Sequence, residues 1–170
     1  VAAMNPCRCG LAGEPGHICR RGPRCVSDYQ ARLSGPLLDR IDIRLDIPAV
    51  SATDLIAPAP AEPSAAVAER VAAARDIQVA RYRKLGISGV TTNAQCAPSV
   101  IEQVAAPDAD AVSLLKSAAE AMRLSARGYH RVLKVARTLA DLEGVVAIGR
   151  IHLAEALSYR AVGDRLTAAA

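Results

Sequence analysis

Four of the five cysteines crowd into the first 25 residues, with the spacing C-x-C-x9-C-x5-C, at Cys7, Cys9, Cys19 and Cys25. Zinc takes four ligands at tetrahedral geometry, and thiolates alone can supply them. The loop at 7–25 is rich in Gly, Pro and Arg and has no apolar periodicity, so a bound metal would give it order. The spacing therefore predicts a zinc site, in which His17 could replace one cysteine. Reduced surface thiols or a labile disulfide pair are the alternatives. Cys96 stands apart and is expected to be a small buried residue.

A second candidate is Arg40, in the sequence LLDRID at 37–42, where a predicted helix leads into a predicted strand. An arginine at such an edge can extend out of its own subunit towards a phosphate on a neighbour, because the planar guanidinium suits phosphate oxygens. The alternative is an ion pair on the chain's own surface, with Asp39 or Asp42. The residue types alone leave both open.

A third candidate is a predicted basic helix that begins after Ser125. Residues 123–137 hold five basic residues and no acid, namely Arg123, Arg127, Arg131, Lys134 and Arg137. Positions 127, 131 and 134 share one face, opposite an apolar stripe of Val132, Val135, Leu139 and Leu142. Arg127 falls in the first turn, where free backbone N–H groups and the helix dipole favour an anion. The pattern indicates a phosphate-binding surface or, alternatively, a solvated charged face.

The elements that must position the first two candidates lie in residues 1–56. Residues 1–5 are predicted to be an apolar strand end, stopped by Pro6. A helix is predicted over 26–38, with Ser27 or Asp28 as its N-cap and an interruption at Gly35-Pro36. Residues 41–47 alternate apolar and charged side chains, which predicts a half-buried strand.

The third candidate lies beyond a predicted stiff linker at 57–63, which holds three prolines. The helices predicted after the linker are one from Ser64 to Leu85 closed by Gly86, a short one with a Ser99–Glu102 capping box, and others at 108–123, 125–143 and 150–160. The predicted fold class is mainly α, the end of an α/β core with one or two strands followed by a helical lid. The predicted domains are 1–56, the linker 57–63 and 64–170.

Composition limits the class of protein further. The chain has 170 residues, 51% hydrophobic, with no Phe or Trp and four Tyr, so its core must use Leu, Val, Ile and Ala. A mean hydropathy of +0.17 excludes wholesale disorder. The absence of a long apolar run and of a secretory signal favours a cytoplasmic protein. The net charge of +4 is compatible with a nucleic-acid partner. The start at Val1, inside an apolar run, indicates a piece of a longer protein.

Three segments together resemble a known family. They are AAMNPCRCG at 2–10, RLSGPLLDRIDI at 32–43 and LSARGYHRVLKVARTLADLEG at 124–144, in the family's order. They closely resemble the Mg-chelatase-like AAA+ ATPases of the ComM/YifB competence-protein group, whose P-loop and Walker B strand would precede Val1. Arg8 stands where other members often carry Pro.

The resemblance implies a role for three residues. Asn5 would match sensor 1, which positions the water that attacks the γ-phosphate. Arg40 would match the arginine finger supplied to a neighbouring subunit's ATP. Arg127 would match sensor 2 on the helical lid.

For the full-length protein the resemblance implies a hexameric ring that uses ATP and Mg²⁺ to move on DNA, a helicase promoting branch migration in natural transformation. Without the Walker motifs, this chain alone is not expected to hydrolyse ATP. Two other functions remain open. The chain could be a zinc-dependent DNA- or protein-binding module, or part of a chelatase-type subunit that remodels a protein partner.

Overall fold

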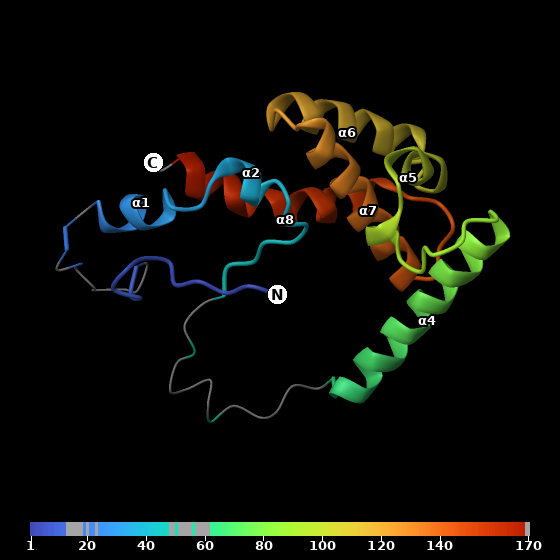
Figure 1. The fold of residues 1–170 in the computed structure, drawn as a ribbon, viewed down its shortest axis with the longest axis horizontal. Coiled ribbons are helices and arrows are strands. Elements are labelled where there is room, and N and C mark those ends of the chain that lie inside the picture. Colours follow the sequence, from blue (N-terminus) through green and yellow to red (C-terminus); the bar gives the residue numbers. More distant parts are fainter. Residues whose placement is uncertain are drawn as a thin grey trace. The chain divides into compact units, whose positions relative to one another are not determined.

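The computed structural model describes residues 1–12, 19, 21–22, 24–47, 50, 56 and 62–168. It divides into two compact units, Val1–Ile56 with Tyr159–Ala170 (unit 1) and Ala57–Ser158 (unit 2). The regular elements are helical, as Figure 1 shows: α1 (Cys25–Gln30), α2 (Gly35–Leu38), α4 (Ser64–Lys84), the 3₁₀ turn η1 (Asn93–Gln95), α5 (Pro98–Val104), α6 (Ala109–Ala121), α7 (Ala126–Leu142) and α8 (Arg150–Ala168). The mainly α fold class is confirmed, whereas most of the predicted linker lies outside the described residues.

The predicted strands at 1–5 and 41–47 are not strands in the structure. A strand is defined by hydrogen bonding to a neighbour, and within the described ranges the one β-type pairing is an isolated bridge between Pro107 and Ile148. The alternation at 41–47 is present in the sequence, but its apolar side chains are exposed, at 49% for Ile43 and 80% for Ile47. A half-buried strand needs a second layer to cover that face, and the described residues of unit 1 do not supply it.

The helix predicted over 26–38 is two helices in unit 1, α1 and α2. A proline inside a helix loses an N–H donor and clashes with the preceding turn, whereas in the first turn it is tolerated. Pro36 accordingly lies in the first turn of α2, and the Ser34 hydroxyl accepts a hydrogen bond from the Leu37 N–H at 3.3 Å. The predicted N-cap of α1 is wrong, because Arg24 takes that position and Ser27 Oγ donates to the Arg24 carbonyl at 3.0 Å.

In unit 2 the ends of α4 and α7 and the starts of α6 and α7 follow the capping signals. Gly86 and Gly144, at φ +70° and +72°, follow α4 and α7 in the left-handed conformation that glycine adopts freely. The side chains of Asp108 and Ser125 cap α6 and α7 by accepting from the N–H groups of Ala111 and Gly128.

Two predicted caps in unit 2 are wrong, and α8 extends beyond the predicted end at 160. Ser64 is already helical, with Pro63 at the N-cap. α5 begins at Pro98, so Ser99 lies inside the helix and forms no capping box. A proline at the first helical position needs no N–H partner, which removes the need for a serine cap there.

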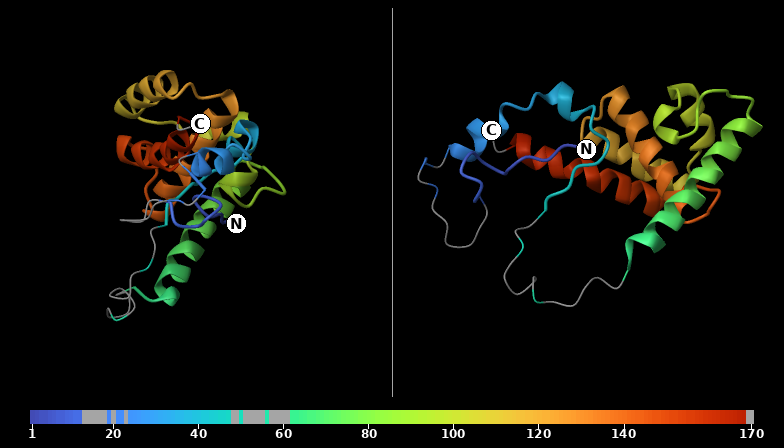
Figure 2. Two further views of the ribbon diagram at one scale, coloured as in Figure 1. Left: turned by 90° about the vertical axis from the view of Figure 1, so that its left-hand side faces the viewer. Right: turned by 60° about the horizontal axis from the view of Figure 1, so that its bottom comes forward.

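The core of unit 2 is built on α7. α4, α5 and η1 each pack against it. Its buried apolar residues, Val132, Leu133, Val135, Ala136 and Ala140, lie in a core that also holds Ile101, Leu115, Ile148, Leu153 and Ala156. The predicted stripe is therefore confirmed in part, because Leu139 and Leu142 are only half-buried. Figure 2 shows α4 extending from this group of helices, and residues 64–73 are exposed. No helix among the described residues is long and apolar enough to span a membrane.

Candidate functional site

The cysteine thiols of unit 1 converge, as the spacing predicts. Cys9 Sγ lies 2.7 Å from Cys7 Sγ and 3.5 Å from Cys19 Sγ, and the sulfur atoms of Cys7, Cys9 and Cys25 all lie within 4.8 Å of one another. Cys7 and Cys25 are buried, and the cysteines are free thiols. Three of the four sulfur donors predicted for a tetrahedral Zn²⁺ therefore form one group, and Cys19 lies beside it next to Cys9. His17, the alternative ligand, lies outside the described residues.

Two glycine turns and a helix start bring these thiols together. Gly10 N–H donates to the Cys7 carbonyl at 3.1 Å, and Gly22 N–H donates to the Cys19 carbonyl at 3.0 Å. Both glycines have positive φ, at +84° and +88°, where a side chain would be strained. Cys25, the first residue of α1, completes the group.

The thiols share protons unequally. The hydrogen bond from Cys9 lowers the pKa of the Cys7 thiol to about 7, and the same contact raises the pKa of Cys9 to about 11. The Arg21 N–H lowers the pKa of Cys19. The lowered pKa values favour the thiolate forms of Cys7 and Cys19. The thiolate is the form of cysteine that ligates a metal.

Asn5 and Arg40, the two predicted catalytic residues of unit 1, are both exposed. Asn5 directly precedes Pro6, whose carbonyl accepts from Gln30 Nε2 at 3.0 Å, so the segment at residue 5 is tied to α1. Arg40 follows α2, with its N–H donating to the Leu37 carbonyl at 3.0 Å.

The alternative interpretation of Arg40 is an ion pair with Asp39 or Asp42. Within the described residues, Arg40 forms no such ion pair. Asp39 Oδ1 accepts from Arg160 Nη2 at 2.5 Å, and the ion pairs of the described part of the chain do not include Arg40. The Arg40 guanidinium is therefore open to an anionic ligand.

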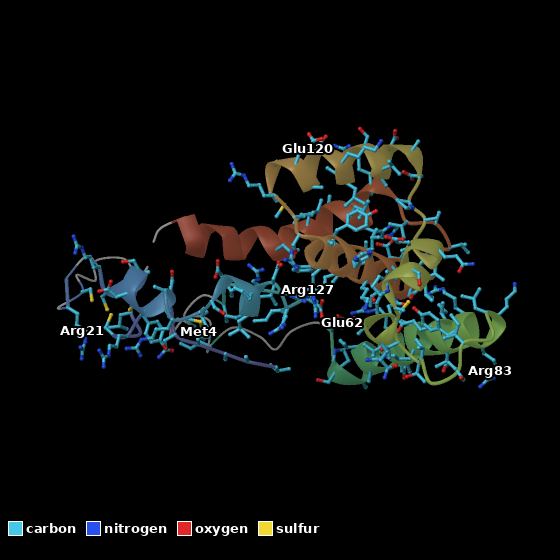
Figure 3. All side chains as sticks on the ribbon, turned by 45° about the horizontal axis from the view of Figure 1, so that its top comes forward. Met4, Arg21, Glu62, Arg83, Glu120 and Arg127 are labelled. Atoms are coloured by element: carbon cyan, nitrogen blue, oxygen red, sulfur yellow. The ribbon has the colours of Figure 1, made fainter. Side chains whose placement is uncertain are left out.

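Arg127, the third predicted residue, belongs to unit 2 and lies in the first turn of α7 (labelled in Figure 3). Its side chain is exposed. The Ser125 cap satisfies the Gly128 N–H at 3.0 Å and fixes the helix start beside it. An exposed cation in the first turn, beside free N–H groups, is suited to contact a phosphate.

The other basic residues of α7 are half-buried or buried, whereas Arg123, which precedes the helix, is exposed. Lys134 Nζ donates to the Ala94 carbonyl at 3.0 Å. Arg137 is 2% exposed and donates to the carbonyls of Val145 and Val146 at 2.6 and 2.5 Å. Arg131 is half-buried. The basic residues of α7 are therefore not all available to an anion, and Arg127 is the exposed one among them.

The sequence reasoning missed a buried polar network centred on Asp141. Its carboxylate accepts from Arg81, from Arg137 Nε at 3.1 Å and from Asn93 Nδ2 at 2.9 Å. Asn93 Oδ1 accepts from the Tyr82 hydroxyl at 2.8 Å. These bonds join α4 and η1 to α7. The signal in the sequence was the i, i+4 spacing of Arg137 and Asp141 among apolar neighbours.

The electrostatics of this network follow from burial and pairing. The hydrogen bond with Asp141 raises the pKa of Arg81, burial lowers the pKa of Arg137, and burial raises the pKa of the Tyr82 hydroxyl. A carboxylate between two guanidinium groups compensates their buried charge, so Asp141 is the residue on which the network depends.

Two family models match the chain. Magnesium chelatase, subunit ChlI, matches residues 1–55, and the ChlI C-terminal model matches residues 61–160. Similar proteins include the competence protein ComM of Haemophilus influenzae, 39% identical over 95% of this chain, and the uncharacterised protein YifB of Escherichia coli, 40% identical over 98%. An uncharacterised protein of Mycobacterium tuberculosis is 37% identical over 97%. The chain spans 30%, 31% and 32% of the lengths of ComM, YifB and the mycobacterial protein.

Proposed function

We propose, because this chain belongs to the Mg-chelatase-like AAA+ ATPases of the ComM and YifB group, that it supplies the sensor, arginine-finger and lid residues of an ATP-driven motor acting on DNA. The observation that carries the proposal is the open Arg40 guanidinium beside an Asp39 that is engaged by Arg160. A guanidinium held free at the end of a helix is available to a phosphate of another subunit.

Each proposed residue has a distinct part in phosphoryl transfer. Asn5 orients the attacking water, and Arg127 contacts the γ-phosphate from the lid of the same subunit. Arg40 enters the ATP site of the neighbouring subunit and stabilises the charge that develops on the transferred group, a contribution of about 10³- to 10⁵-fold in rate. The exposure of all three side chains supports these roles, since a buried residue could not reach a nucleotide.

The proposed motor is a hexameric ring that uses ATP and Mg²⁺, and the P-loop and Walker B carboxylate belong to the part of the subunit that this chain does not contain. We expect no hydrolysis by these 170 residues alone. In the ComM-like activity proposed here, the ring promotes branch migration of DNA during natural transformation. The four cysteines of unit 1 hold Zn²⁺, which orders the segment around Arg8 and Arg21.

The test is an ATPase assay on a subunit of the relatives' length that contains this chain. DNA should stimulate hydrolysis, and a folded protein without DNA should not. Stimulation by a protein partner alone would favour the alternative, a chelatase-type subunit that remodels a protein. Equal rates with and without DNA would contradict a DNA motor.

A further inference from the structure

A pocket of about 200 Å³ in unit 1 lies beside the cysteine group. It is lined by Arg8, Arg21, Cys25, Asp28, Tyr29 and Arg32. α1 contributes Cys25, Asp28 and Tyr29, and Arg32 follows two residues after its last one. Arg8 lies between two of the clustered cysteines, and Arg21 lies two residues after Cys19. Figure 3 shows Arg21 where the sulfur atoms gather beside α1. The turns that bring the thiols together therefore also bring these arginines to one pocket.

The charge of the pocket is unbalanced. Among the residues that the structure describes, three guanidinium groups line it against one carboxylate, Asp28. Arg8, Arg21 and Arg32 are exposed, and no ion pair within the described residues includes them. Like charges brought together without compensation repel one another, so the arrangement favours an anionic ligand.

The chemistry of the lining identifies the anion. Guanidinium groups bind phosphate oxygens in bidentate fashion, and three of them around one opening suit a phosphodiester. Tyr29, one of the four tyrosines of the chain, lines the same pocket and is half-buried. An aromatic ring next to arginines is the combination with which proteins bind single-stranded nucleic acid, the bases stacking while the cations follow the backbone.

We propose that this arginine pocket binds a backbone phosphate of single-stranded DNA and that Tyr29 stacks on an adjacent base. The inference extends the proposed function, because it places a DNA contact at the cysteine group rather than on α7. A free inorganic anion would use the arginines alone, whereas a strand would use the arginines and the tyrosine.

The experiment measures binding of a fluorescent oligothymidine to this chain by anisotropy, between about 50 and 200 mM salt. The pocket variant is the triple change Arg8→Gln, Arg21→Gln, Arg32→Gln. The matched control removes three exposed charges from unit 2, by Arg75→Gln, Arg83→Gln and Lys116→Gln. The third variant is Tyr29→Leu. Far-UV circular dichroism and thermal melting check that each variant is folded.

The pocket variant should bind at least about tenfold more weakly, and the slope of log K against log salt should become shallower by about 0.7 for each phosphate that the pocket no longer binds. The control should bind almost as the parent does. Tyr29→Leu should weaken binding about tenfold with little change in the slope. The parent should prefer the single strand to a duplex of the same length, and excess inorganic phosphate should compete no better than an equal ionic strength of chloride.

Equally weakened binding in the pocket variant and its control would overturn the proposal, because it would indicate a general charge effect. No binding of the single strand by the parent chain would also overturn it. So would tight binding of inorganic phosphate together with unchanged strand binding by the Tyr29→Leu variant. These failures are separable from failure of the proposed motor, since DNA-stimulated ATPase activity of the longer subunit is measured independently. If stimulation persists while the pocket variant leaves strand binding unchanged, the motor stands and the pocket does not.

Discussion

Arg160 binds the carboxylate of Asp39, with 2.5 Å between Nη2 and Oδ1, across 121 positions of sequence. Arg160 has a side chain that is 5% exposed, and Asp39 one that is 30% exposed. The pair joins the turn after α2 to the C-terminal part of α8 within unit 1. It also engages the acid next to Arg40, and the ion pairs of the described residues do not include Arg40.

Replacing Asp39 by Ala should destabilise unit 1, because it leaves the guanidinium of Arg160 buried without its counter-charge. The expected loss is about 1–3 kcal/mol in the free energy of unfolding, the cost of an unpaired charged group. Urea unfolding of the chain measures it, with the exposed Asp46→Ala as control. Equal midpoints for the two variants would show that the pair adds no stability.

Replacing Asp141 by Ala should have a larger effect, in unit 2. Two guanidinium groups and the Asn93 amide would lose their common acceptor inside the core, at a cost of about 3–5 kcal/mol. Asp110 in α6 is exposed and provides the control Asp110→Ala, for which we expect little change. Circular dichroism during urea titration follows both. A stable, cooperative Asp141→Ala variant would refute the structural role of the network.

The Asp39–Arg160 pair and the Asp141 network show what could and could not be predicted from the sequence. The ends of α6 and α7, and the glycine that follows α4, were predictable because a capping side chain or a glycine after the last turn is a local signal. Arg160, the partner of Asp39, and Arg81 and Asn93, two of the partners of Asp141, lie far from these acids along the chain, and no local pattern indicates them. The sequence also does not show that the N–H groups of Arg137, one of the basic residues at 123–137, donate to the carbonyls of Val145 and Val146.

The strands at 1–5 and 41–47 illustrate the same limit. Alternation of apolar and charged residues suits a β-strand with one face buried, but a strand forms only when a second strand is there to hydrogen-bond with it. In that segment the Arg44 N–H donates to the Tyr159 carbonyl at 3.2 Å, a contact with α8 and not with a second strand. For the site, the convergence of the cysteines was predictable from spacing. The arginine pocket beside them was not, because its lining comes from two turns and a helix.

The zinc prediction is tested by metal analysis. The purified chain should contain about one zinc, and Cys25→Ser should lose most of it because one of four ligands is removed. Cys96→Ser is the matched control, a buried cysteine outside the group, and should keep the metal. A chain without zinc, in which the cysteines at 7, 9, 19 and 25 all react freely with an alkylating agent, would exclude the site.

Arg127→Ala should slow ATP hydrolysis in a subunit of the relatives' length, and the hexameric ring should not dissociate. The side chain is exposed at the start of α7 and contributes nothing to the core of unit 2, so the fold should be unchanged. Steady-state hydrolysis and sedimentation measure the two effects, and Arg83→Ala, also exposed, is the control. Unchanged hydrolysis would contradict the sensor role.

An arginine finger supplied by Arg40 to the next subunit is tested by mixing two inactive subunits, one with Arg40→Ala and one lacking the Walker lysine. Each alone should hydrolyse ATP about 10³-fold more slowly than the parent or worse. In random mixed rings, about a quarter of the interfaces would join an intact nucleotide site to an intact Arg40 of the neighbour, if the ring is closed and cyclic. Mixing the two variants should therefore restore part of the DNA-stimulated hydrolysis. No recovery, in rings shown to be mixed, would contradict an arginine finger supplied from one subunit to the next.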